Sequence, residues 1–195
     1  MERRIKTGIF SGSFNPIHTG HLIIANYLCQ FGGLDEVWFV VSPQNPMKDQ
    51  SALIDDRHRV AMVERAIQGC PQLKHCDIEL SMPRPSYTIR TLDTLREQYP
   101  DRDFHLIIGA DNWAGFDRWK EAPRILNEYS LVVYPRQGYP MAKCPESEKN
   151  VILSDAPVME LSSTFIRNGV KQGKNMTGFV PAGAYDYMVE NRLYL

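Results

Sequence analysis

The chain has 195 residues, of which 43% are hydrophobic and 23% charged, the balance of an ordinary globular domain. The formal net charge is −1, from 22 basic and 23 acidic residues, which argues against binding duplex nucleic acid in bulk. A small anionic ligand is still compatible with this composition, because a local site can be basic inside a neutral protein.

Length and apolar content predict one domain over residues 1–195, with a closing helical portion from about residue 160. No C-x-x-C pair occurs among the four cysteines, so we expect no disulfide framework. The charged N-terminus has no apolar stretch after it, and no apolar run is long enough to span a membrane. We therefore expect a cytoplasmic protein without membrane contact, whose assembly state, monomer or homo-oligomer, stays open.

Continuous apolar runs predict buried strands, and apolar residues at helical spacing predict helices between them. The expected strands cover residues 5–10, 36–42, 74–80, 104–108, 131–134 and 151–153. The expected helices cover residues 19–31, 55–68, 86–99, 123–128, 162–170 and 182–191, with Thr19 and Ser86 as caps of the first and third. The segment 137–150, which contains Gly, Pro and Lys residues, is expected to be a surface loop.

Strands without apolar–polar alternation, separated by helices, indicate a parallel sheet covered on both faces. The expected fold class is therefore α/β, with a Rossmann-like, doubly wound parallel sheet. Such sheets bind ligands beyond the carboxyl ends of their strands, so functional residues should follow each strand.

The loop after the first strand carries two histidines at the start of a helix. Gly12 and Gly20 allow close backbone approach, and free N–H groups at a helix start form an anion site. His18 and His21 can both face that site and donate to phosphate oxygens. An isolated H-x-x-H is more often a tight turn with surface or capping histidines. A zinc site is disfavoured, because the cysteines offer no further ligand at useful spacing.

Common phosphate-binding loops do not account for this segment, since the chain has no Walker A motif and no G-x-G-x-x-G fingerprint. The segment 12–21 (GSFNPIHTGH) instead resembles the H-x-G-H signature of the nucleotidylyltransferase superfamily. The segment 161–167 (LSSTFIR) is similar to the second signature of that superfamily, I-S-S-T-x-x-R. The two signatures occur in the expected order, so together they are a specific indication of resemblance to that superfamily.

Three further segments resemble bacterial nicotinate-nucleotide adenylyltransferases. They are 83–92 (PRPSYTIRTL), 108–120 (IGADNWAGFDRWK) and 133–138 (VYPRQG). The resemblance implies adenylyl transfer from ATP to nicotinate mononucleotide, with Mg²⁺ bound to ATP and deamido-NAD and pyrophosphate as products. Alternatives are another nucleotidylyltransferase, such as a phosphopantetheine adenylyltransferase, or a nucleotide sensor without turnover.

The resemblance also implies residue roles. It assigns catalysis to His18, His21, Lys48 and Arg167. It assigns ATP binding to Gly12, Ser13, Phe14, His18, His21, Gly109, Asp111, Ser162, Ser163, Thr164 and Arg167. It assigns the mononucleotide to Ser86, Tyr87, Thr88, Trp113 and Arg136, and no metal-ligating side chain is expected.

Physical chemistry agrees with several of these roles. An indole face such as that of Trp113 stacks well on a pyridine ring, although a tryptophan here could equally be a core residue. The helix start at residues 86–88 offers N–H donors to a carboxylate. Asp111 can accept from ribose hydroxyls or cap the next helix. Two positions depart from the family: Asn15 stands where Asp is frequent, and Met47 replaces a histidine beside Lys48.

Overall fold

The computed structural model describes residues 3–43, 53–141 and 150–195, and it is built on a six-stranded sheet whose neighbouring strands are all parallel. The strands are β1 (Ile5–Gly12), β2 (Glu36–Val41), β3 (Leu73–Cys76), β4 (Arg102–Gly109), β5 (Ser130–Tyr134) and β6 (Val151–Leu153). Their order is β3-β2-β1-β4-β5-β6. This confirms the predicted doubly wound fold, in which the strand order reverses between β1 and β4.

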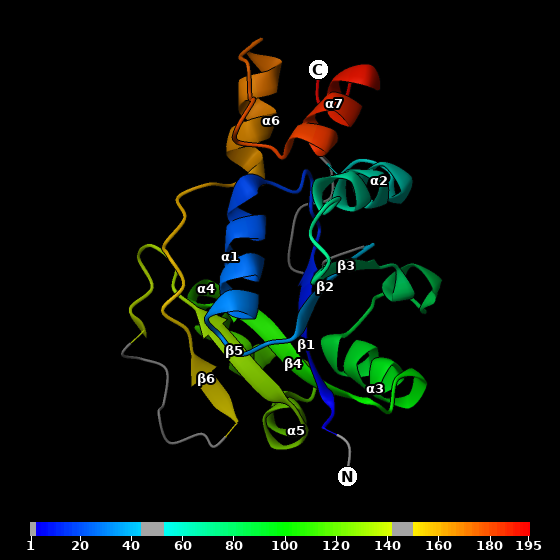
Figure 1. Ribbon diagram of the computed structural model, residues 1–195, viewed down its shortest axis with the longest axis vertical. Helices are drawn as coiled ribbons and strands as arrows, with labels where there is room; N and C mark the ends of the chain where they lie inside the picture. The colour runs from blue at the N-terminus through cyan, green and yellow to red at the C-terminus, as the bar shows by residue number, and fades with distance from the viewer. Residues whose placement is uncertain (1–2, 44–52, 142–149) are drawn as a thin grey trace.

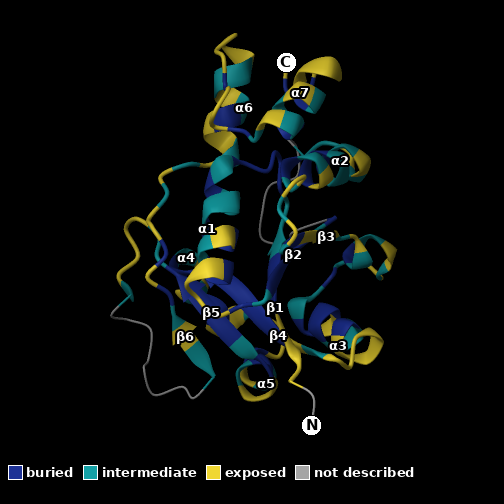
Figure 2. Cartoon of the chain, viewed as in Figure 1, coloured by how far each residue is buried: buried dark blue, intermediate teal, exposed yellow. Residues whose placement is uncertain are grey.

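Alternating residues of the strands build two separate cores, one on each face of the sheet. Phe10, Phe39 and Ile107 belong to one core, whereas their neighbours Ile9 and Ile108 belong to the other. Both faces of the central strands are therefore apolar, which explains the continuous hydrophobic runs in the sequence. Figure 2 shows the central strands as mostly buried and the outer helix faces as exposed.

The helices divide between the two faces. The first core takes apolar residues from α1 (Thr19–Gln30), α2 (Asp56–Ala66), α6 (Ser163–Lys171) and α7 (Ala182–Glu190). The second takes them from α3 (Thr88–Gln98) and α5 (Ala122–Glu128). Short turns complete the list: η1 (Ile78–Ser81), α4 (Ala110–Trp113) and η2 (Phe116–Arg118). Figure 1 shows α6 and α7 beyond the carboxyl end of β1, next to the start of α1.

Local details of three predicted elements were wrong. The N-cap of α1 is His18 rather than Thr19, whose hydroxyl donates to the Gly178 carbonyl at 2.8 Å. The predicted strand 74–80 ends at Cys76 and continues as the turn η1. Ser86 does not cap α3, which begins at Thr88. In each case a side chain or segment is drawn into a tertiary contact that local propensity does not encode.

No helix within the part of the chain that the structure describes is long and apolar enough to cross a membrane. The predicted loop 137–150 lies mostly outside the described residues.

Candidate active site

The predicted phosphate-binding loop follows the carboxyl end of β1, at the position in the sheet where the strand order reverses. It runs from Ser13 to the start of α1, and the neighbouring strand β4 ends at Gly109, directly before α4. Ligands of doubly wound sheets bind in the crevice at this position. The fold thus places the first signature and the segment after β4 side by side.

His18 and His21 form a stacked pair at the start of α1. Their ring centroids lie 3.6 Å apart, with an interplanar angle of 19°. The backbone N–H of His18 donates to Nδ1 of His21 at 3.2 Å. Nδ1 is therefore an acceptor, which places the proton of a neutral His21 on Nε2 and makes that atom a donor.

His18 is a neutral imidazole at physiological pH. Its side chain is buried, and burial lowers its pKa to about 4, with a smaller effect from the positive charge of Arg136. A neutral ring still offers one N–H donor without adding a full charge to the site. The pair can therefore donate hydrogen bonds to an anion without two positive rings repelling each other.

Gly20, between the two histidines, leaves the space that the His18 ring occupies. A Cβ at this position would lie 3.1 Å from Nδ1 and 3.2 Å from Cε1 of His18. Such contacts are tighter than about nine in ten real Cβ contacts, so a side chain here would push the ring aside by a few tenths of an ångström. The glycine of the first signature thus has a steric reason in this structure.

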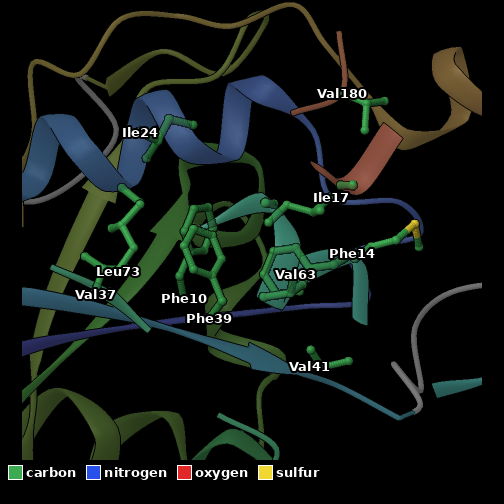
Figure 3. Close-up of a cluster of buried hydrophobic side chains, with 14 of the residues drawn as sticks. Phe10, Phe14, Ile17, Ile24, Val37, Phe39, Val41, Val63, Leu73 and Val180 are labelled. Carbon is green, nitrogen blue, oxygen red and sulfur yellow. The ribbon is translucent and has the colours of Figure 1, made fainter. Parts of the chain in front are cut away.

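Phe14 lies beneath the histidine pair rather than in the open site. Its ring is 3% exposed and meets His21 edge-on at 5.1 Å between centroids. The Phe10 ring also meets His21 edge-on, at 5.8 Å. Figure 3 shows Phe14 with Phe10 and Phe39 in the hydrophobic cluster below α1. The predicted ATP contact of Phe14 can therefore come only from its backbone, whereas its ring supports His21.

The second signature is bound directly to the first. The hydroxyl of Ser163 donates to the Pro16 carbonyl at 2.8 Å, and Nη1 of Arg167 donates to the Asn15 carbonyl at 2.8 Å. Two further hydroxyl groups of this signature accept hydrogen bonds from α6 itself. The Ser162 hydroxyl accepts from the backbone N–H of Phe165 as N-cap, and that of Thr164 accepts from Arg167. The N–H groups of Ser163 and Thr164, which precede these bonds, have no acceptor within the helix and can serve an anion.

Asp111 and Arg136 complete this edge of the sheet. Arg136 Nε lies 3.6 Å from Asp111 Oδ1, and a Cβ on Gly109 would lie 2.3 Å from that same oxygen. Gly109 therefore lets the carboxylate fold back over the end of β4. The structure brings Gly109, Asp111 and Arg136 together close to His18, whose pKa responds to the Arg136 charge.

Two buried polar atoms at this edge have no hydrogen-bond partner within the described residues, Nδ1 of His18 and Oδ1 of Asp111. Buried polar atoms in folded proteins nearly always have one. One atom follows β1 and the other follows β4, so both flank the crevice between those strands. Apart from the Arg136 guanidinium 3.6 Å from Asp111 Oδ1, no polar group of the described residues is assigned to these two atoms, so both are candidates for contact with a polar ligand.

Comparison with known proteins identifies the family. The sequence profile of the cytidylyltransferase-like family matches residues 9–169. A nicotinate-nucleotide adenylyltransferase of Bacteroides fragilis is 51% identical over 187 residues, which cover 96% of this chain and 92% of the relative. That of Flavobacterium johnsoniae is 42% identical, with 97% and 99% covered.

The chain belongs to the nicotinate-nucleotide adenylyltransferases. The resemblance drawn from its sequence motifs is thereby confirmed. Its fold matches that of the Plasmodium falciparum nicotinic acid mononucleotide adenylyltransferase complexed with NaAD, with a TM-score of 0.79 and 20% identity. That match covers 97% of each chain.

The residues predicted to bind the mononucleotide are only partly gathered in this adenylyltransferase. Trp113 stacks on Phe116, with ring centroids 5.4 Å apart, and lines a pocket of about 770 Å³. None of residues 86–88 is among the described residues lining that pocket. The Tyr87 ring instead lies 4.5 Å from Lys120 Nζ. Lys48 and Met47 lie outside the described residues.

Sequence reasoning missed two buried charged residues of the adenylyltransferase. Arg59 is fully buried and donates through Nη1 to the carbonyls of Ser13, at 2.6 Å, and Ser42, at 2.7 Å. It also pairs with Asp56. Glu79 is buried in η1. An Arg in a charged helix and a Glu in an apparent strand carry no sequence signal of burial, so only the tertiary structure shows them.

No group of three or more His, Cys, Asp or Glu side chains suited to a metal ion occurs in residues 3–43, 53–141 and 150–195.

Proposed function

We propose that this adenylyltransferase transfers the adenylyl group of ATP to nicotinate mononucleotide, giving nicotinate adenine dinucleotide and pyrophosphate. The observation that carries the proposal is the direct joining of the two signatures, through Ser163 to Pro16 and Arg167 to Asn15. The joining links the loop that carries the histidine pair to the helix that carries Arg167, which supports one shared anion site. The names of the relatives supply the acceptor.

The reaction is an in-line displacement at the α-phosphorus of ATP. A phosphate oxygen of the mononucleotide forms the new P–O bond, and the bond to the bridging β-phosphate oxygen breaks. Its electron pair leaves with pyrophosphate, so no covalent enzyme intermediate is needed. Such transfers depend on positioning and on stabilising the charge that develops on the phosphate oxygens.

The residues of this chain have distinct parts in that step. His21 donates from Nε2 to a phosphate oxygen, and the neutral His18 donates beside it. Arg167 adds a charge-assisted bond to the leaving pyrophosphate, together with Lys48. The N–H of Gly20 in α1 and those of Ser163 and Thr164, which follow Ser162 in α6, bind the remaining oxygens. The N–H of Thr19 is already bound to the Phe179 carbonyl at 2.9 Å.

The nucleoside and pyridine parts occupy the edges of the crevice. Asp111, whose Oδ1 makes no hydrogen bond within the described residues and lies 3.6 Å from Arg136 Nε, accepts from ribose hydroxyls. Arg136 pairs with a phosphate, and Gly12, Ser13 and Gly109 allow the backbone to approach it. The start of α3 at Ser86, Tyr87 and Thr88 holds the nicotinate carboxylate, and Trp113 contacts the ring.

Mg²⁺ enters with ATP as part of the substrate. It neutralises phosphate charge and keeps mostly phosphate and water ligands, so it needs few protein carboxylates. The donors of this edge, two imidazoles and two guanidinium groups, suit phosphates rather than a tightly bound protein metal.

Pyrophosphate release from ATP and Mg²⁺ with a panel of acceptors tests the function. We expect turnover with nicotinate mononucleotide and a clear loss with nicotinamide mononucleotide, because donors facing an amide are left partly unpaired. Turnover with phosphopantetheine, or with glycerol phosphate and CTP, would assign a different transferase. Nucleotide binding without any release would assign a sensor.

A further inference from the structure

Glu79 is a buried carboxylate surrounded by hydroxyl donors. It is 3% exposed and accepts hydrogen bonds from four side chains. The hydroxyls of Ser11, at 3.3 Å, and Thr91, at 3.0 Å, donate to Oε1. Those of Ser42, at 2.6 Å, and Ser86, at 2.9 Å, donate to Oε2. Among the described residues no salt bridge reaches this carboxylate, so hydroxyl groups alone satisfy it.

The four donors come from three different parts of the fold. Ser11 lies at the carboxyl end of β1 and Ser42 follows β2, so both border the phosphate-binding loop. Ser86 precedes α3 and Thr91 lies in its second turn. The hydroxyls of Ser11 and Ser42 also lie 3.0 Å apart. One carboxylate therefore joins the end of the central sheet to the start of α3.

We propose that Glu79 is a positioning residue that fixes the start of α3 relative to the phosphate-binding loop and thereby sets the affinity for the mononucleotide. The inference rests on the proposed function, in which residues 86–88 bind the nicotinate carboxylate. Ser86 is buried and bound to Glu79 and is therefore an anchor, while the N–H groups that follow it are the ones that the proposed function assigns to the ligand. Loss of the anchor leaves those donors less well oriented.

The ATP side has anchors of its own. Arg59 holds the carbonyls of Ser13 and Ser42, and α6 holds those of Asn15 and Pro16. Within the described residues, the side chains of Ser86 and Thr91 are connected to the carboxyl ends of the strands by hydrogen bonds only through Glu79. The effect of changing Glu79 should therefore fall on the mononucleotide and leave ATP binding largely intact.

Glu36 provides a matched control. It is also a buried glutamate on the same sheet, at the start of β2, and it accepts from Thr7, Trp38 and Arg102. It lies at the opposite end of the strand from the site. Glu36→Gln disrupts a buried carboxylate network of similar size, so it reports what lost stability alone does to the kinetics.

Steady-state kinetics of the full chain measure the effect. In Glu79→Gln, the amide nitrogen cannot accept from two of the hydroxyls, and we expect KM for nicotinate mononucleotide to rise about 10-fold. KM for ATP and kcat should change by less than about threefold. Thr91→Val keeps the side-chain shape, removes one hydroxyl, and should show a smaller rise of the same kind. Glu36→Gln should leave both KM values unchanged.

Hydrogen–deuterium exchange of the same proteins tests positioning without turnover. We expect faster exchange at residues 86–91 in Glu79→Gln and Thr91→Val, and no change there in Glu36→Gln. An unchanged KM for the mononucleotide with unchanged exchange would overturn the role of Glu79, as would an equal rise in both KM values. If the wild-type chain makes no product from ATP and the mononucleotide, the proposed function fails, and the exchange result still decides whether Glu79 orders α3.

Discussion

At the scale of single residues, the site depends on the state of two imidazoles. His21 accepts a backbone hydrogen bond through Nδ1, which fixes its tautomer, and His18 is kept neutral by burial. A donor that is already oriented costs no reorganisation when charge develops in the transition state. In the proposed reaction, the stacked geometry, with centroids 3.6 Å apart, would let both rings donate to one group of phosphate oxygens.

His21→Ala removes one of these donors. We expect kcat to fall by roughly 10²–10³, the usual effect of losing a donor that acts in the transition state. The fold should persist, because the side chain is only half-buried. Steady-state rates measure the change, with His75→Ala on the exposed part of β3 as control. Near-wild-type turnover in His21→Ala would contradict the role of this residue.

The low pKa of His18 makes stability depend on pH. In the unfolded chain the imidazole binds a proton below about pH 6.5, whereas in the folded chain it does so only near pH 4. The contribution of the neutral ring to the free energy of unfolding is therefore fully present above about pH 6.5 and is lost as the pH falls toward 4. The loss between pH 7 and pH 5 should be about 2 kcal/mol.

The variant His18→Asn, which does not titrate, isolates this contribution. Asparagine is also a good N-cap, so α1 should keep its start. Urea unfolding at pH 7 and pH 5 should show that the variant loses about 2 kcal/mol less than the wild type between the two pH values. Equal pH dependence in both proteins would show that His18 is not held neutral by the fold.

At the scale of elements, the strands and helices could be predicted from apolar patterning, and the doubly wound sheet followed from them. The predictions that were wrong concern the end of one strand and the N-caps of two helices. The run 74–80 looks like one strand, yet Glu79 within it turns away to meet Ser42 and Ser86. Ser86 and Thr19 have the chemistry of caps, but each donates to a distant group instead. Such choices depend on partners remote in sequence, which periodicity does not contain.

The same limit applies to the site. The residues proposed to bind phosphate could be picked out because two short signatures carry them, and the structure joins those signatures through Ser163 and Arg167. Arg59 and Glu79 could not, because nothing in their neighbourhoods marks a charged residue as buried. The pairing of Asp111 with Arg136 likewise follows only from the adjacency of β4 and β5.

Gly20→Ala tests how the geometry of α1 controls the histidine pair. Alanine within a helix normally stabilises by about 0.5–1 kcal/mol relative to glycine. Here its Cβ would lie 3.1 Å from Nδ1 of His18, so the ring must move. We expect kcat to fall about 10-fold while the free energy of unfolding changes by less than about 1 kcal/mol. Unchanged turnover would mean that the position of the His18 ring is not critical.

At the scale of the whole molecule, the C-terminal end of the chain returns to the first loop. The hydroxyl of Tyr194 donates to Oδ1 of Asn15 at 2.8 Å, across 179 residues of sequence. The Asn15 carbonyl accepts from Arg167 at the same time. Burial raises the pKa of Tyr194, so its hydroxyl remains a protonated donor at all ordinary pH values. The phosphate-binding loop is thus held by β1, α6 and the residues after α7 together.

Tyr194→Phe removes this one hydrogen bond and keeps the ring. Because both partners are buried, we expect a loss of about 1–2 kcal/mol in the free energy of unfolding. For a chain of this length that corresponds to a drop in Tm of roughly 2–8 °C. Tyr185→Phe is the matched control, since its hydroxyl donates to Asn175 at 3.2 Å on the surface and should contribute less than about 0.5 kcal/mol. Equal effects of the two variants would show that the Tyr194 hydrogen bond does not stabilise the loop. A larger loss of stability in Tyr194→Phe means that the residues after α7 help to fix the loop in place.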